Sequence, residues 1–481
     1  MFDQTIAIPT TYQSTLNETM IASFMRQFGG KIVQPGDPGY DSDRRVWNGM
    51  IDKHPALIAY CHSVDDVITA VNFAREQNVL AAVRGGGHNV AGNAVCDGGL
   101  VIDLSPMRKI EVDPEARTVR VEAGATIGEV DRATQPYGLA TPTGNVSETG
   151  IAGLTLGGGL SWLRRKYGMN IDSLLRVELV TADGRVLAAS ATENADLFWG
   201  IRGGGGNFGI VTAFEFRLYP VGPEVSLLSV FYPYTMAREV LAAWRSFTET
   251  APDEVSSDAI LWQIPAVPLF PEAIHGELIV GMGAVHVGPV DEGMRLLQPL
   301  RELGEPLVDM SGPLPYLAVQ SAFDPLFPAH ELRYYWKSLY LDHLDDRVLD
   351  AILRWNETRP SPRTFIPIRH LGGAISRVAE GATAASNRQS PYLLSIDMTW
   401  SDRNDDAKNV AWTQAFWREM HRFSSAGGVY LNFAGLGEEG QRMMQSAHGP
   451  NYKRLVALKN KYDPTNFFRL NQNIVPSVSR T

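Results

Sequence analysis

The segment from Gly144 to Gly159 restricts the fold of this chain more than any other stretch. Six of its sixteen residues are glycine, and most of the others are small or apolar. Because glycine loses more backbone entropy on folding than other residues, we expect this segment to form neither a standard helix nor a strand. The composition instead favours a backbone that passes closely around a flat, extended ligand.

A second glycine-rich segment lies upstream, where the apolar run Leu80–Val83 leads into Arg84-Gly85-Gly86-Gly87-His88-Asn89. This order predicts a buried strand that opens into a loop, whose bare amides form a concavity for an anion. Arg84 would add a positive charge, and His88 an imidazole that can act as a nucleophile or carry protons. A phosphate-bearing cofactor fits such a loop. The alternative is a tight turn that leaves His88 on the surface.

A third cluster contains a formal G-x-G-x-x-G match, the dinucleotide fingerprint, at Gly204, Gly206 and Gly209. A helical stretch, Ala195–Arg202, precedes it and a predicted strand, Ile210–Leu218, follows it. This is the reverse of the strand-turn-helix order that the fingerprint requires, so we reject a Rossmann NAD site. The chain also lacks the G-x-x-x-x-G-K-[ST] sequence of a P-loop.

Composition excludes several other classes of protein. The net charge of −10 gives no basic footprint for nucleic acid. No apolar run approaches the about 20 residues that span a bilayer, and no secretory signal is visible at the N-terminus. Two cysteines, Cys61 and Cys96, exclude a disulfide scaffold and a Cys-rich zinc site, so we expect no metal and a reduced, cytoplasmic setting. Cys96 is interpreted as a small buried thiol.

The pattern of predicted elements indicates an α+β fold. In residues 1–220, helices and strands alternate without a regular repeat. Helices are expected at Leu16–Phe28, Ser63–Gln77 and Thr126–Tyr137, with Ser63 and Asp66 as an N-cap, and strands at Leu80–Val83, Leu100–Leu104, Lys109–Val112 and Thr118–Glu122.

From Val221 onward, aromatic-rich strands alternate with helices, which predicts a sheet with one face covered by helices. The expected strands are Val225–Tyr232, Glu277–Val287, Leu332–Tyr340, Phe365–His370 and Leu393–Trp400, separated by helices at about 236–249, 290–303, 346–356 and 405–423. The other face, with residues such as Tyr335, Trp336, Arg369 and His370, could line a pocket or be ordinary core. A further strand at Tyr430–Phe433 and a helix at Tyr452–Tyr462 complete the chain.

Together these motifs resemble bacterial berberine-bridge-enzyme-like oxidases, which are FAD enzymes of the vanillyl-alcohol oxidase / p-cresol methylhydroxylase superfamily. The likeness covers nearly the whole chain and rests on R-G-G-G-H, G-N-V-S-E-T-G-I-A-G-L-T-L-G-G-G, D-L-F-W-G-I-R-G-G-G-G-N-F-G-I-V-T, Y-x-N-F and D-P-T-N-F-F-R-L-N-Q-N-I. It implies an FAD-binding part at 1–220, a substrate-binding domain with a mainly antiparallel sheet at 221–429, and a return to the FAD-binding domain at 430–481.

The resemblance also implies that FAD is attached covalently through His88. Some relatives carry a second link through a cysteine, but Val146 stands at that position here, so a single link is expected. The residues implied to contact FAD are Arg84, Gly85, Gly86, Gly87, His88, Asn89, Gly92, Gly144, Asn145, Val146, Thr149, Gly150, Gly153, Leu154, Gly157, Gly158, Gly159, Gly209, Ile210, Val211, Tyr430, Asn432 and Asn471.

For the reaction, the resemblance implies hydride transfer from a CH-OH or CH-NH carbon of a small organic substrate to the flavin. Oxygen would then reoxidise the flavin and give hydrogen peroxide. Phe433 stands where many relatives have a tyrosine base. His370 is our first candidate for the missing base, because an imidazole titrates near neutral pH. Tyr430 is the second candidate for the base, although strand alternation would point it to the other side of the strand from Phe433. Lys337 is a possible electrostatic aid.

Other activities stay open from the sequence. Thr149, small and polar beside the flavin edge, favours access of oxygen, but a flavin-dependent dehydrogenase or monooxygenase of natural-product biosynthesis is an alternative. A non-catalytic FAD-binding protein is another, since the usual base is missing. The substrate, which could be a secondary metabolite, a sugar or an alkaloid-like compound, and the oligomeric state are not specified by the sequence.

Overall fold

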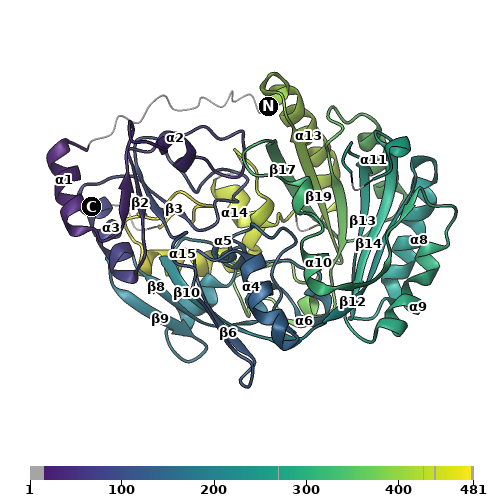
Figure 1. Cartoon of the computed structure of the whole chain (residues 1–481), viewed down its shortest axis with the longest axis horizontal. Helices are drawn as coiled ribbons and strands as arrows, with labels where there is room; N and C mark the ends of the chain where they lie inside the picture. Colours follow the sequence, from purple (N-terminus) through teal and green to yellow (C-terminus); the bar gives the residue numbers. More distant parts are fainter. Residues whose placement is uncertain (1–15, 269, 426, 438–439, 478–481) are drawn as a thin grey trace.

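The structure is a computed structural model that describes residues 16–268, 270–425, 427–437 and 440–477. Figure 1 shows two parts side by side, one containing the N-terminal half of the chain on small sheets and one built on a single large sheet. The C-terminal segment, in yellow, packs back against the first part. The predicted α+β class is confirmed, because helices and mainly antiparallel sheets form separate layers.

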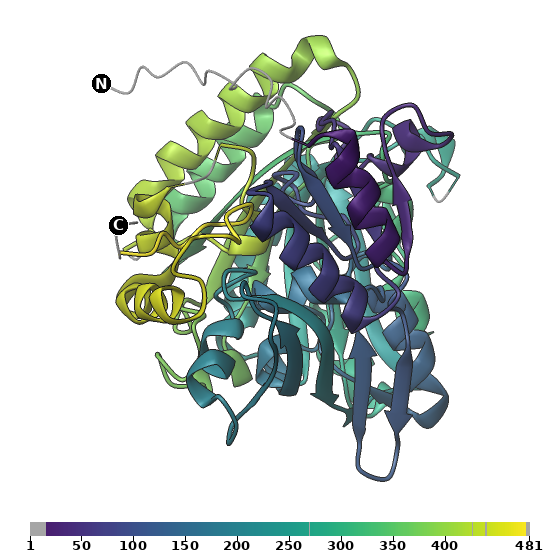
Figure 2. The same cartoon turned by 90° about the vertical axis from the view of Figure 1, so that its left-hand side faces the viewer.

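The first sheet has four strands in the order β1-β2-β4-β3, with β2 and β3 parallel to β4. Its strands are β1 (Lys31–Val33), β2 (Leu57–Tyr60), β3 (Ala81–Arg84) and β4 (Leu100–Asp103), and its helices are α1 (Glu18–Gln27), α2 (Tyr40–Asp43) and α3 (Val64–Glu76). The predicted cap of α3 is present, since the amide of Asp66 donates to Ser63 Oγ at 3.2 Å. Figure 2 shows α1 and α3 in front of the small sheets. Phe24 of α1 and Phe73 of α3 stack with their ring centroids 4.3 Å apart.

The second sheet is antiparallel, with the order β5-β6-β10-β8-β9. Its strands are β5 (Ile110–Asp113), β6 (Thr118–Glu122), β8 (Leu174–Val180), β9 (Val186–Ser190) and β10 (Ile210–Arg217), and β7 (Leu139–Ala140) pairs separately with β11 (Tyr219–Pro220). The helices are α4 (Ile127–Thr134), η1 (Gln135–Tyr137), α5 (Ile151–Leu156), α6 (Arg164–Tyr167), η2 (Asn170–Asp172) and α7 (Ala195–Ile201). Because α7 precedes the third glycine cluster and β10 follows it, the rejection of a Rossmann turn is confirmed.

The glycine-rich segment 144–159 differs from the prediction in one respect. Its residues Ile151–Leu156 form the short helix α5, although we expected no helix there. The glycines mostly flank this helix, with Gly150 at its N-cap and Gly157 at its C-cap. The entropic cost of glycine therefore falls mainly on the two approaches to the helix, and Gly153 is the one glycine in its interior.

The large sheet is antiparallel throughout, in the order β15-β12-β14-β13-β18-β19-β17, with β16 paired to β12. Its strands are β12 (Glu224–Pro233), β13 (Val255–Gln263), β14 (Leu278–His286), β15 (Val308–Asp309), β16 (Gly312–Pro315), β17 (Arg333–Leu341), β18 (Ile366–His370) and β19 (Tyr392–Trp400). All five predicted strands are confirmed. The central strand β13 was not predicted.

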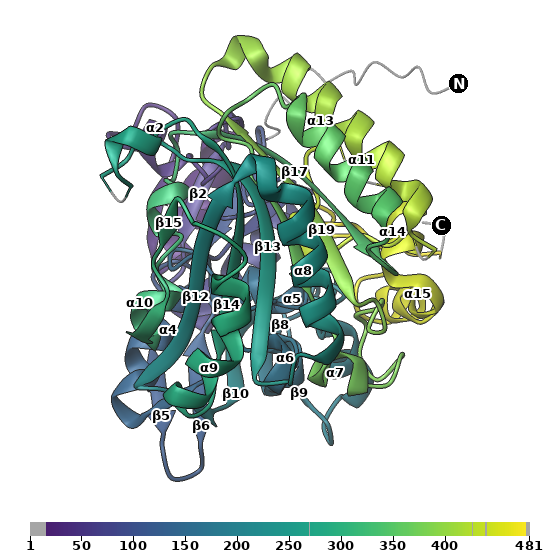
Figure 3. The same ribbon diagram turned by 90° about the vertical axis from the view of Figure 1, so that its right-hand side faces the viewer.

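Four amphipathic helices cover one face of the large sheet, as Figure 3 shows. They are α8 (Ala237–Thr250), α9 (Val290–Arg301), α11 (Asp346–Glu357) and α13 (Asp406–Met420). Shorter elements connect them: η3 (Tyr234–Met236), η4 (Glu272–Ile274), α10 (Tyr316–Gln320), η5 (Asp324–Leu326), α12 (Ala374–Arg377), η6 (Arg403–Asp405) and η7 (His421–Phe423). Trp244 of α8 and Phe416 of α13 are fully buried in the core between helices and sheet.

The C-terminal segment consists of η8 (Leu431–Phe433), α14 (Gln441–His448), η9 (Gly449–Asn451) and α15 (Tyr452–Tyr462). The predicted strand at Tyr430–Phe433 is wrong, because its last three residues form a 3-10 turn. Lys459 links α15 to the N-terminal half, because its buried Nζ donates to Asn207 O at 2.9 Å. The same Nζ also donates to Asp463 Oδ2, just after α15, at 2.7 Å. Within the described ranges, no helix is long and apolar enough to cross a membrane.

Candidate active site

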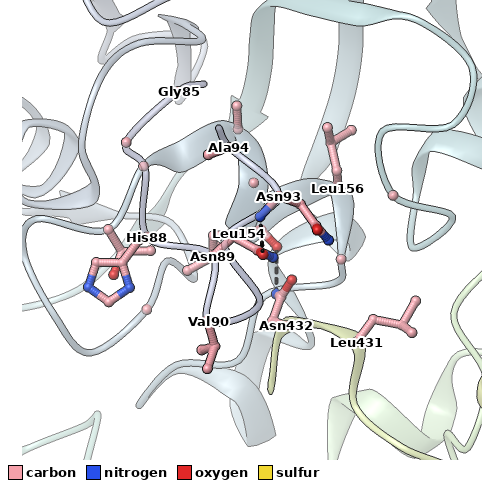
Figure 4. A pocket seen from close by; sticks show the side chains of 18 of the residues that line it. Gly85, His88, Asn89, Val90, Asn93, Ala94, Leu154, Leu156, Leu431 and Asn432 are labelled. Carbon is pink, nitrogen blue, oxygen red and sulfur yellow. Dashed lines mark hydrogen bonds between the residues drawn. The ribbon is translucent and has the colours of Figure 1, made fainter. Parts of the chain in front are cut away.

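One cavity of about 310 Å³ lies between the two parts of the molecule. Most of the residues that the resemblance implied to contact FAD line this cavity. Figure 4 shows the loop after β3, Leu154 and Leu156 of α5, and Leu431 and Asn432 of the C-terminal segment around it. Nineteen of the twenty-three implied residues line it: Gly85, Gly86, Gly87, His88, Asn89, Gly144, Asn145, Val146, Thr149, Gly150, Gly153, Leu154, Gly157, Gly209, Ile210, Val211, Tyr430, Asn432 and Asn471.

Glycines allow three distant segments to meet at this cavity. A Cβ added to Gly86 would lie 2.5 Å from the backbone N of Gly150, so the two glycine-rich loops touch through bare backbone. A Cβ on Gly157 would lie 1.9 Å from Asn432 Oδ1, so the C-terminal segment can lie this close to the end of α5 only because residue 157 is glycine. Asn432 Nδ2 donates to Leu154 O at 3.0 Å (Figure 4). These close approaches explain why the segments need glycine at these positions.

Arg84 does not face the cavity, contrary to our prediction of a positive charge for an anion. Arg84 and Asp103 end the neighbouring parallel strands β3 and β4 in register, and their buried side chains form an ion pair at 2.5 Å. The charge of Arg84 is thus neutralised inside the protein. Any anion in the loop would be bound by backbone amides. Gly92, Gly158 and Gly159 also lie outside the lining and pack against neighbouring side chains.

His88 lies in the cavity wall beside an aromatic stack. Its ring stacks on Trp47 with centroids 4.2 Å apart, and Trp47 stacks on Tyr334 at 3.7 Å. Burial lowers the pKa of His88 to about 4, so the imidazole is neutral at physiological pH. Its Nε2 atom is buried and has no hydrogen-bond partner among the described residues. The surface alternative for His88 is therefore wrong, and a neutral imidazole with an unpartnered Nε2 is chemically suited to act as a nucleophile.

The side chains of His370 and Lys337 lie on the face of the large sheet opposite the cavity, so neither side chain lines it. His370 shares its face of β18 with Ile366 and Ile368, which belong to the core under the helices. Its Nε2 lies 2.8 Å from Arg165 Nη1. Burial and the adjacent arginines lower the pKa of His370 to about 2. His370 is therefore not placed to act as the base.

The Lys337 side chain packs under α13, with its Nζ 4.5 Å from the centre of the Trp417 ring. Burial lowers the pKa of Lys337 to about 7. The neighbouring residue Trp336 lines the cavity instead, because alternate residues of a strand face opposite sides of a sheet. Lys337 is therefore not in a position to assist a substrate directly.

Tyr430 and Phe433 both line the cavity, although strand alternation predicted opposite sides. In the observed 3-10 turn, residues three apart fall on the same side, and the two rings meet edge to face at 4.9 Å. Tyr430 Oη accepts a hydrogen bond from Asn432 Nδ2 at 2.9 Å. Burial raises the pKa of Tyr430 to about 12, which opposes the role of a base near neutral pH.

The sequence analysis missed a group of charged side chains on the cavity side of the large sheet. Asp258 of β13, Arg369 of β18 and Asp397 of β19 line the cavity, and only Arg369 was considered. Asp258 is opposite Arg369 in the strand register and also pairs with Arg164 of α6. Each of these strands is otherwise rich in buried apolar residues, so a charged residue within such a run was the available signal.

Asp397 is a buried carboxyl group whose pKa is shifted toward neutrality. Burial raises its pKa to about 6, while the positive charge of Arg369 acts in the opposite direction. Arg369 Nη2 lies 3.9 Å from Asp397 Oδ2, and Ser395 Oγ donates to Asp397 Oδ1. An acid with this pKa is ionised at neutral pH and can accept a proton there.

Comparison with known proteins agrees with this architecture. The FAD binding domain family matches residues 55–190, and the Berberine and berberine like family matches residues 429–475. An uncharacterized FAD-linked oxidoreductase of Bacillus subtilis, YgaK, is 31% identical over 93% of this chain and 97% of its own length. The chain belongs to the berberine-bridge-enzyme-like FAD-linked oxidoreductases.

Among the solved structures, 6-hydroxy-D-nicotine oxidase from Arthrobacter nicotinovorans superposes with a TM-score of 0.82. It is 27% identical, and the match covers 93% of this chain and 98% of that chain. A related curated protein, (R)-6-hydroxynicotine oxidase of Paenarthrobacter nicotinovorans, is 29% identical over 94% of this chain and 97% of its own length. This berberine-bridge-enzyme-like chain is therefore an enzyme, an FAD-linked oxidoreductase.

The glycine-rich side of the cavity has the features that FAD requires. His88 Nε2, Asn145 Oδ1 and Asn471 Oδ1 are buried there without a hydrogen-bond partner in the part of the chain that the structure covers. A Cβ added at Gly153 or Gly206 would meet no described atom within 4 Å, so both glycines leave open space at the wall. These unpartnered groups would bind a polar ring edge or attach to it. Across the same described residues, no group of His, Cys, Asp and Glu could hold a metal ion.

Proposed function

We propose that this enzyme is an oxidase that removes a hydride from a CH-OH or CH-NH carbon of a small organic molecule. FAD, when bound, accepts the hydride and passes the two electrons to oxygen, which becomes hydrogen peroxide. His88 is the proposed covalent attachment point, as a single link. The two buried free thiols, Cys61 and Cys96, support a reduced, cytoplasmic setting.

One observation carries this proposal: a single cavity has the glycine-rich wall on one side and buried charged residues on the other. Gly85 to His88 and Gly153 lie on the first side, and Asp258 and Asp397 on the second. A cofactor against the first wall would leave the second wall for a substrate. The remaining space is bounded by residues of both parts of the chain.

We assign proton removal to Asp397. Its carboxylate would take the proton from the substrate hydroxyl or amine as the hydride leaves the adjacent carbon, so that a carbonyl or imine forms. Phe433 has no ionisable group, and the pKa values of His370 and Tyr430 are displaced away from neutrality. Arg369, close to Asp397, would keep the carboxylate ionised above about pH 6.

The function is tested by screening purified protein for hydrogen peroxide release with alcohols and amines of four classes: sugars, alkaloids, phenolic compounds and polyketides. We expect at least one class to release peroxide and to bleach the flavin when oxygen is excluded. Bleaching without peroxide formation in air would indicate a dehydrogenase. Absence of bleaching by every class would favour a protein that binds FAD without turnover, and would contradict the proposal.

The role of Asp397 is tested with the active substrate in the Asp397→Asn variant. The rate of flavin reduction should fall by about 10²- to 10⁴-fold, which is typical of a lost general base. In the unmodified enzyme the rate should rise with pH through about 6, because Asp397 must lose its proton first. Asp65→Asn, at an exposed site on α3, is the matched control. An unchanged rate in Asp397→Asn would show that another group takes the proton.

A further inference from the structure

The substrate side of the cavity is walled mainly by aromatic rings. Phe323, Phe327, Trp336, Phe365 and Phe433 all line it. Their rings meet edge to face: Trp336 lies 5.6 Å from Phe433 and 5.8 Å from Phe327, at interplanar angles of 86° and 79°. Such a wall offers flat apolar surfaces with fixed orientations.

Two hydrogen-bond donors in this wall are buried and have no acceptor. They are Arg369 Nη1 and Trp336 Nε1, which lack a partner anywhere in the described residues. Arg369 is only 11% exposed, and its guanidinium lies 4.8 Å from the centre of the Phe433 ring. The carboxylates of Asp258 and Asp397 are 4.0 Å and 3.9 Å away, too far for a hydrogen bond. A buried unpaired donor is costly, so an acceptor atom of a ligand is the expected partner.

The position of Asp397 adds an acceptor to these donors. Asp397 on β19 is directly opposite Trp336 on β17 in the strand register, and Arg369 is on the adjacent strand β18. A single hydroxyl group could therefore accept a hydrogen bond from Arg369 and donate one to Asp397. A methyl ether or a halide could do only the first of these.

We propose that the substrate is an aromatic compound whose hydroxyl group binds between Arg369 and Asp397, with its ring against Trp336 and Phe433. This inference rests on the proposed function and names the substrate class for the same site. The hydroxyl is carried either on the carbon next to the ring, as in an aryl carbinol, whose own carbon then loses the hydride, or on the ring, as in a phenol. In the phenol the ring carbon bears no hydrogen, so the hydride would leave a CH-OH or CH-NH carbon attached to the ring and conjugated with the phenol oxygen. Both forms present the same oxygen and hydrogen to the two side chains.

The test is anaerobic titration calorimetry of the flavin-loaded enzyme with four probes: 2-naphthol, 2-naphthalenemethanol, 2-methoxynaphthalene and cellobiose. We expect at least one of the two hydroxyl compounds to bind about tenfold or more tightly than the methoxy compound, the difference typical of a hydrogen bond to a charged group. The tighter of the two tells whether the hydroxyl belongs on the ring or on the adjacent carbon. Binding of cellobiose in preference to all three aromatic probes would overturn the inference, as would equal binding of all four.

Variants distinguish the hydroxyl contact from nonspecific apolar binding to the aromatic residues. Asp397→Asn should reduce the preference for hydroxyl over methoxy, because only the hydroxyl donates to this carboxylate. Arg369→Gln should weaken the hydroxyl and methoxy compounds alike, since both oxygens can accept from Arg369, whereas Arg347→Gln, at an exposed position on α11, should change neither. Trp336→Phe keeps a ring in the wall but removes its N–H, and should weaken all three aromatic probes by a similar, smaller factor. A hydroxyl preference that is undiminished in Asp397→Asn, or unchanged binding of both compounds in Arg369→Gln, would contradict the assignment.

Failure of this inference can be distinguished from failure of the proposed function. If a sugar releases peroxide and no naphthalene probe binds, the enzyme is an oxidase but not one for aromatic hydroxyl compounds. If the naphthalene probes bind with the expected preference and no compound in the screen reduces the flavin, the binding site is confirmed and the oxidase proposal is wrong.

Discussion

A buried carboxyl group at the junction of the two parts should make the stability of the protein depend on pH. Asp131 of α4 is 2% exposed, and Gln320 of α10 donates from its Nε2 to Asp131 Oδ2 at 3.0 Å. The same Nε2 lies 3.0 Å from Thr143 Oγ1 and 3.1 Å from Gly144 O. Burial raises the pKa of Asp131 from 3.8 to about 7, against the lowering effect of its hydrogen bonds with Gln320 and Thr143.

The sign and size of the effect follow from that pKa. Because the pKa of Asp131 is higher in the folded than in the unfolded protein, the folded state binds the proton more tightly. Its contribution to stability is complete below about pH 4 and is lost as pH rises to about 7. The difference between 3.8 and about 7, at about 1.4 kcal/mol for each pH unit, gives a loss of about 4 kcal/mol.

The Asp131→Asn variant should remove this pH dependence, since an amide does not titrate. Its free energy of unfolding in urea, minus that of the unmodified protein, should rise by up to about 4 kcal/mol between pH 4 and pH 8. Asp65→Asn, exposed on α3, should show no such rise. A difference between Asp131→Asn and the unmodified protein that is the same at both pH values would refute the reasoning.

Three further predictions concern the cavity. Acid precipitation should leave the flavin attached to the protein, and His88→Ala should release it; free flavin from the unmodified protein would disprove the covalent link. Thr149→Leu should slow reoxidation by oxygen more than flavin reduction, because the bulkier side chain would restrict the access of oxygen to the flavin edge. Equal slowing of the two steps in stopped-flow absorbance would count against this role of Thr149. Phe433→Tyr should not raise the rate of flavin reduction more than about twofold if Asp397 already removes the proton; a large gain would show that the usual base is needed.

Most local structure was predictable from the sequence, because it depends on neighbouring residues. The capped helix α3 and the strands β3 to β6 follow from turn residues, caps and periodicity within short windows. The convergence of the glycine segments on one cavity was implied by the resemblance. The cavity itself depends on contacts such as Gly86 with Gly150, which are 64 positions apart in the chain.

The catalytic side was predicted poorly, and for identifiable reasons. A strand's pattern gives two alternating faces but not which one meets the cavity, so His370 was chosen where its neighbour Arg369 lines the wall. Strand β13 was missed because it begins Val255-Ser256-Ser257-Asp258, which looks polar. Ser257 and Asp258 are buried there through distant partners: Trp244 Nε1 donates to Ser257 Oγ at 3.1 Å, and Arg164 pairs with Asp258.

The central claim, that substrate and oxygen react in turn at one flavin in this cavity, is tested most directly by a single turnover. The purified enzyme is mixed without oxygen with the most active compound from the peroxide screen, and air is then admitted while flavin absorbance and peroxide are recorded. We predict complete bleaching, full recovery of the absorbance in air, and one peroxide for each flavin reduced. Bleaching that does not recover in air, or recovery without peroxide, would contradict the account.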